Sequence, residues 1–70
     1  MIVKSTLAAM PTYDFNCRLI YYTPSGYRRH SYHKTRAIAA DLAIKIAEKQ
    51  LRNDKRRRVA RVSYGEAIQQ

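Results

Sequence analysis

Hydrophobic and polar residues alternate most regularly between Tyr13 and Thr23. Five apolar or aromatic side chains occupy every second position, with polar residues between most of them: Tyr13, Phe15, Cys17, Leu19 and Tyr21. A period of two is typical of a strand that buries one face. The segment Thr23-Pro24-Ser25-Gly26 then predicts a turn, because proline presets the backbone and glycine tolerates a positive φ.

The next segment, Tyr27 to Lys34, predicts the second strand of a hairpin. It is rich in arginine, histidine and lysine, which suits an edge strand, because charged side chains discourage unwanted pairing. The side of the sheet on which each residue lies depends on the hairpin register, which the pattern leaves open.

One possible register pairs Tyr22 with Tyr27. Because side chains alternate along a strand, this register would turn Tyr27, Arg29 and His33 away from the core. Tyr32 would then face the core.

An alanine-rich segment from Arg36 to about Arg52 contains no glycine or proline and predicts a helix, with Thr35 as its N-cap. Charged residues share one arc of this helix, and the apolar arc is broader than an ordinary one-sided stripe. A three-stranded sheet would cover only part of this arc. The uncovered flank suggests a homodimer in which the helix packs against another backbone, unless residues 1–12 cover it. The small residues of that flank are Ala39, Ala40, Ala43 and Ala47.

Alternation returns from Val59 to Tyr64 and predicts a third strand that ends at Gly65, followed by a frayed tail over 65–70. In this strand Ala60 and Val62 would face the core, with Val59 facing out. Residues 1–12 have no clear pattern.

The expected fold is therefore α+β, a single domain over 13–64 in the order strand, strand, helix, strand. One helix would cover one face of a three-stranded antiparallel or mixed sheet, with the first strand in the centre.

Fourteen Lys and Arg residues against five Asp and Glu residues give the chain a net charge of +9. The excess lies outside the predicted helix. Strand alternation places Arg18, Arg57 and Arg61 on the uncovered face of the sheet, beside Ile20 and Tyr22. Arginines among tyrosines can bind single-stranded nucleic acid, since guanidinium groups neutralise phosphates and aromatic rings stack on bases.

The run from Lys55 to Arg58 is the densest basic cluster and suits a phosphate backbone. Such residues can also form a solvated surface or complement the helix dipole, and tyrosine is a common strand residue. We predict nucleic-acid binding with weak sequence preference, to DNA or RNA. The candidate binding residues are Arg18, Tyr22, Tyr27, Arg28, Arg29, Lys55, Arg56, Arg57, Arg58 and Arg61.

The sequence predicts no catalytic, metal or cofactor site. Cys17 is the only cysteine and lies on the predicted core face, where cysteine behaves as a small hydrophobic residue. His30 and His33 would point to opposite faces of a strand. No apolar run reaches the ~18 residues of a membrane span, and no signal-peptide pattern is present, so we expect a cytoplasmic protein without a membrane partner.

The order strand, strand, helix, strand resembles small phage proteins that inhibit host enzymes, such as the host RNA polymerase inhibitors of T7-like phages. The resemblance concerns the order of elements alone and carries over no residue. It implies an alternative function, in which the chain is a host-takeover or regulatory factor that binds an acidic or nucleic-acid-handling protein.

Overall fold

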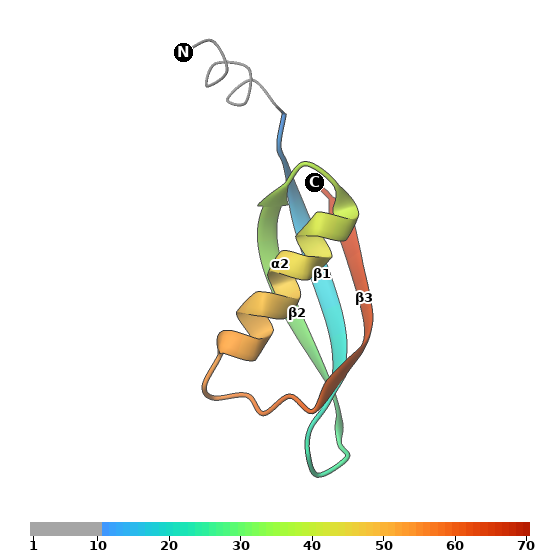
Figure 1. The fold of residues 1–70 in the computed structure, drawn as a ribbon. Coiled ribbons are helices and arrows are strands. Elements are labelled where there is room, and N and C mark those ends of the chain that lie inside the picture. Colours follow the sequence, from blue (N-terminus) through green and yellow to red (C-terminus); the bar gives the residue numbers. More distant parts are fainter. Residues whose placement is uncertain (1–10) are drawn as a thin grey trace.

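The computed structural model describes residues 11–70 as a three-stranded antiparallel sheet with one helix on one face (Figure 1). The elements are β1 (Tyr13–Tyr22), β2 (Arg28–Ala37), α2 (Ala40–Asn53) and β3 (Arg61–Gln69). The strand order in the sheet is β2-β1-β3. The α+β class, the order of elements and the central position of the first strand are therefore confirmed.

Residues 23–27 connect β1 to β2, and Pro24, Ser25 and Gly26 form a three-residue loop between Thr23 and Tyr27. The Gly26 N–H donates to the Thr23 carbonyl at 2.9 Å, and the Thr23 N–H donates to the Tyr27 carbonyl at 2.9 Å. Gly26 has a φ of 92°, so this is a hairpin loop that ends in a glycine bulge. The extra loop residue makes Tyr22 pair with Arg28 instead of Tyr27.

This register reverses the faces that the Tyr22–Tyr27 pairing assigns to the second strand. We call the side of the sheet opposite α2 the open face. Arg28 and Tyr32 lie on it, while Arg29 and His33 lie on the helix side. The expected orientations of Tyr32, Arg29 and His33 were therefore wrong, because a one-residue shift moves every side chain to the other face.

The helix begins four residues later than predicted, because β2 continues to Ala37 and pairs there with Tyr13. Thr35 is a buried strand residue whose Oγ1 lies 3.4 Å from the Cys17 Sγ. It is not the helix cap. The N-cap residue is Ala39, which makes no side-chain capping hydrogen bond. Pairing with a distant strand has outweighed the local helical preference here.

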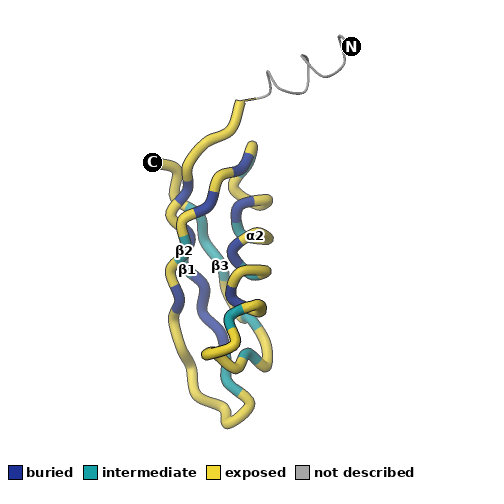
Figure 2. Tube along the Cα trace, turned by 90° about the vertical axis from the view of Figure 1, so that its left-hand side faces the viewer, coloured by how far each residue is buried: buried dark blue, intermediate teal, exposed yellow. Residues whose placement is uncertain are grey.

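The core lies between β1 and α2, and Figure 2 shows buried segments of both elements facing each other. Ala43 and Ala47 are fully buried, so the small side chains let the helix approach the sheet closely. Two of the four alanines expected at a dimer flank are therefore core residues. The exposed apolar residues along this part of the chain are Ile38, Leu42 and Ile46.

The third strand runs from Arg61 to Gln69, with Gln69 paired to Phe15. The predictions of a strand end at Gly65 and of a frayed tail over 65–70 were therefore wrong. Backbone pairing with β1 orders this segment, although its sequence pattern is weak. A register shift opposite Ile20 and Tyr21 marks a bulge in this pairing.

The segment before β3 also differs from the prediction: β3 begins at Arg61, so Arg57 lies in the preceding loop and not on the open face of the sheet. Val59 packs against the core and Ala60 is exposed, the reverse of the expected orientation. Val62 packs against the core as predicted. Residues 1–10, most of the N-terminal segment without a clear pattern, lie outside the described part of the chain.

Candidate nucleic-acid interface

Tyr22 lies on the open face at the end of β1, between two arginines. Its Cα partners are Arg28 on β2 and Arg61 on β3. Adjacent strands are about 4.8 Å apart, so the three residues form one row across the sheet. The Arg61 guanidinium lies 4.4 Å from the centroid of the Tyr22 ring, a cation–π contact that orients the guanidinium.

Arg18 lies further along the same face but is held by an acid. Its Nη2 donates to the Glu66 Oε1 at 3.1 Å, and the Tyr64 hydroxyl donates to the same oxygen at 3.0 Å. The Arg18 guanidinium also lies 5.9 Å from the Tyr64 ring centroid. A half-buried arginine engaged in this way is not free to bind a phosphate.

The hairpin turn carries a second arginine and tyrosine pair. The Arg29 guanidinium lies 5.9 Å from the ring centroid of Tyr27, whose side chain is 64% exposed. Arg29 pairs with Tyr21 and so lies on the helix side of the sheet. The arginines of β2 therefore reach both sides of the hairpin.

Asp54 organises the basic loop that follows the helix. Its Oδ1 accepts a hydrogen bond from the Arg56 backbone N–H at 3.0 Å, and its Oδ2 lies 3.4 Å from the Arg57 Nε. The Arg56 Nε is 4.0 Å from the Asp54 carboxylate and its side chain is almost fully exposed. Lys55 and Arg58 are exposed too. The ion pair of Arg56, whose side chain is 95% exposed, holds that guanidinium only weakly.

This loop lies at the same end of the molecule as the hairpin turn, as Figures 1 and 2 both show. The Ala60 N–H donates to the Tyr22 carbonyl at 2.8 Å, which attaches the end of the loop to β1. We call the basic residues gathered here the hairpin-end cluster: Arg28, Arg29, Lys55, Arg56, Arg57, Arg58 and Arg61. Among residues 11–70, Asp54 has the only carboxylate within 4.0 Å of any of them.

The structure thus brings nine of the ten candidate residues to one end of the sheet: the hairpin-end cluster, Tyr22 and Tyr27. Arg18 is the exception. The open face also exposes Tyr32, Lys34 and Arg36 along β2, which were missed because the hairpin register was open. The glycine at the third position of the loop is typical of a three-residue hairpin loop with a bulge, and it could have set the register and so identified these three residues.

The helix side of β2 carries one titratable group with a shifted pKa. Burial lowers the pKa of His33, and the charge of Arg57 acts in the same direction, against the opposite effects of Gln50 and Asp54. The His33 Nε2 lies 3.0 Å from the Ser31 Oγ. No group of three or more metal-ligating side chains occurs among residues 11–70.

Comparisons with protein-family models, curated proteins and solved structures found no significant match to this chain. Within the part of the chain that the structure describes, no helix is both long enough and apolar enough to cross a membrane.

Proposed function

We propose that this protein binds nucleic acid through the hairpin-end cluster, with weak sequence preference. The observation that carries the proposal is the charge balance at this end of the sheet: among residues 11–70, Asp54 has the only carboxylate within 4.0 Å of any of the seven cationic side chains. Concentrated positive charge attracts polyanions and releases the counterions condensed on their phosphates.

The row of Arg28, Tyr22 and Arg61 suggests how a strand would be held. Two guanidinium groups flank an aromatic ring, so phosphates would bind on either side of it. The exposed ring of Tyr27 is available for stacking, which contributes about 1–3 kcal/mol per base and tolerates any sequence. Phosphate contacts and stacking carry little base information, so weak sequence preference follows.

Salt dependence tests this mode of binding. If the cluster neutralises about five phosphates, the slope of log K against log salt is about −4.5 on a duplex and about −3.5 on a single strand. Fluorescence anisotropy with labelled single-stranded and duplex DNA and RNA, at several salt concentrations, measures both slopes. Absence of binding to every one of these at low salt would refute the proposal.

A charge-matched pair of variants locates the surface. We expect Arg28→Gln with Arg61→Gln to weaken binding roughly tenfold and to reduce the slope by about two. Lys45→Gln with Lys49→Gln removes the same charge from the helix and leaves binding within about twofold. Equal losses in the two variants would show that net charge acts without a defined site.

A protein partner is the second candidate, and the outer edge of β2 favours it. β2 is an edge strand of the sheet, and an extended segment of another protein can add to such an edge. An acidic protein surface would also complement the hairpin-end cluster, as in a phage-type regulatory factor. Recovery of a stoichiometric partner from nuclease-treated lysate, lost on mutating Arg28 and Arg61, would favour this function. For either function we propose a cytoplasmic location, where the thiol of Cys17 stays reduced.

A further inference from the structure

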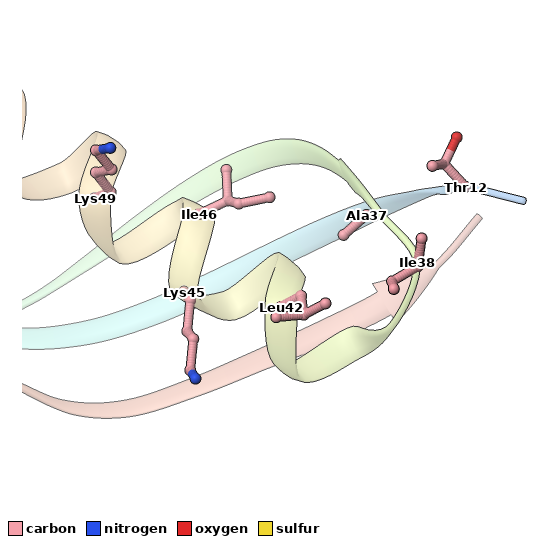
Figure 3. A pocket seen from close by; sticks show the side chains of 7 residues that line it. All are labelled: Thr12, Ala37, Ile38, Leu42, Lys45, Ile46 and Lys49. Carbon is pink, nitrogen blue, oxygen red and sulfur yellow. The ribbon is translucent and has the colours of Figure 1, made fainter. Parts of the chain in front are cut away.

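An apolar groove runs along α2 beside the end of β2. Its volume is about 380 Å³, within the usual range for ligand-binding pockets. Figure 3 shows Leu42 and Ile46 on neighbouring turns of α2, with Lys45 and Lys49 on the same stretch of the helix. Ala37 and Ile38, at the end of β2 and just after it, complete the apolar lining.

Three of the four apolar side chains that line the groove are not part of the buried core, to which only Ala37 belongs. Ile38, Leu42 and Ile46 are 43%, 37% and 38% exposed, while Ala43 and Ala47 on the other side of the helix are fully buried. Contiguous exposed apolar surface is a feature of interaction sites, whereas single exposed apolar residues are ordinary.

The charges around the groove select the kind of occupant. Lys45 and Lys49 line it, and no carboxylate among residues 11–70 lies within 4.0 Å of either. Residues 1–10 contain no Asp or Glu, so they bring no complementary charge. A second copy would add two more lysines and another +9 of net charge, which opposes self-association.

We propose that this groove binds an amphipathic segment of a partner protein, with aliphatic side chains that enter the groove and carboxylates that meet Lys45 and Lys49. Helix-in-groove recognition uses this combination, with apolar anchors at i, i+3 or i+4, and i+7. The segment would bury Ile38, Leu42 and Ile46 and pair with the two lysines.

The groove is separate from the hairpin-end cluster. Ala37 pairs with Tyr13 at the start of β1, whereas Arg28 pairs with Tyr22 at its end. The proposal therefore does not depend on nucleic-acid binding. The two surfaces could be occupied together, and the protein would then link an acidic partner to a nucleic acid.

The test uses the full chain and a synthetic helical peptide with leucines at i, i+4 and i+7 and glutamates at most other positions. One matched peptide has lysine in place of glutamate, and another has serine in place of leucine. We expect the leucine–glutamate peptide alone to bind, with the largest amide shifts in NMR titration at Leu42, Ile46 and Lys49. Equal affinity for the serine–glutamate peptide would overturn the proposal, because net charge alone would then explain binding.

Matched variants separate the groove from the rest of the surface. Ile46→Gln should weaken peptide binding about tenfold or more, while Ile68→Gln, an exposed isoleucine on the open face, should have no effect. Lys49→Gln should weaken binding about threefold or more, whereas Lys34→Gln, which removes the same charge from the opposite face of the sheet, should not at ~0.15 M salt. Equal effects within either pair would refute the proposal.

Two further outcomes would assign the groove to another occupant. Sedimentation equilibrium that shows a dimer, lost in Ile46→Gln, would assign it to a second copy. A gain in peptide affinity on Leu7→Ser would assign it to the N-terminal residues of the chain itself. We expect a monomer and an unchanged affinity.

Discussion

Gly65 lies in β3 directly beneath α2, and its replacement by alanine tests how closely the helix and sheet pack. A Cβ at this position would lie 2.8 Å from the Ile44 Cγ2 and 3.0 Å from the Leu19 Cδ2. Ordinary carbon contacts are about 3.5–4.0 Å, so the neighbours would have to move by about 0.5–1 Å. Leu19 is fully buried, and χ1 of isoleucine in a helix has one strongly preferred rotamer. The helix itself would therefore have to shift.

Overpacking of this kind costs about 1–3 kcal/mol. Replacing a glycine inside a strand by alanine by itself stabilises the fold by roughly 0.5–1 kcal/mol, because glycine loses more conformational entropy on folding. We therefore expect Gly65→Ala to lower the free energy of unfolding by about 1–2 kcal/mol. For a domain of this size, the melting temperature should fall by roughly 5–15 °C. Urea denaturation followed by far-UV circular dichroism measures the change.

A double-mutant cycle identifies the cause. Ile44→Ala removes the Cγ2 that the new methyl group meets, whereas Ile44→Val keeps it. We expect about 1 kcal/mol of favourable coupling between Gly65→Ala and Ile44→Ala, and none with Ile44→Val. A Gly65→Ala protein as stable as the wild type, or coupling of the same size with both Ile44 variants, would refute the reasoning.

Further variants probe the core, the turn and one half-buried histidine. Leu51 is fully buried, so Leu51→Ala should cost about 2–5 kcal/mol in urea denaturation, against about 0.5 kcal/mol or less for the exposed Ile68→Ala. Gly26 has a φ of 92° and open space at its Cβ position. Gly26→Ala should therefore lower the free energy of unfolding by about 1–2 kcal/mol through backbone strain alone, and Gly26→Asn should lower it less. Equal stability of the two variants would contradict this. Burial lowers the pKa of His33 below its ordinary value, so the unfolded chain binds this proton more readily. The stabilisation by neutral His33 is complete above about pH 6.5 and is lost as the pH falls below that value. If His33→Gln loses as much stability at low pH as the wild type and the His30→Gln control, His33 is excluded as the cause.

The open face shows where sequence reasoning about the candidate interface succeeded and where it failed. Alternation along β1 correctly placed Ile20 and Tyr22 opposite the helix, because each strand residue points away from its neighbours. The faces of β2 could not be obtained in this way. They depend on one hydrogen-bonded loop around Gly26, which sets the pairing of Tyr22 with Arg28.

The sequence by itself determined the kinds of elements and their order. Period-two alternation from Tyr13, an alanine-rich helix without glycine or proline, and a proline–glycine turn are local signals, and each formed the element that it predicted. The concentration of basic residues outside the helix was also visible in the sequence.

Only the tertiary structure decided where the elements end and which side chains meet. β2 continues to Ala37 and β3 to Gln69 because β1 pairs with both, and those hydrogen bonds join residues far apart in the chain. The same pairing brings Arg28 and Arg61 to either side of Tyr22. Local periodicity reports only neighbours within a few residues, whereas the free energy that sets these boundaries and contacts comes from long-range backbone pairing and core packing.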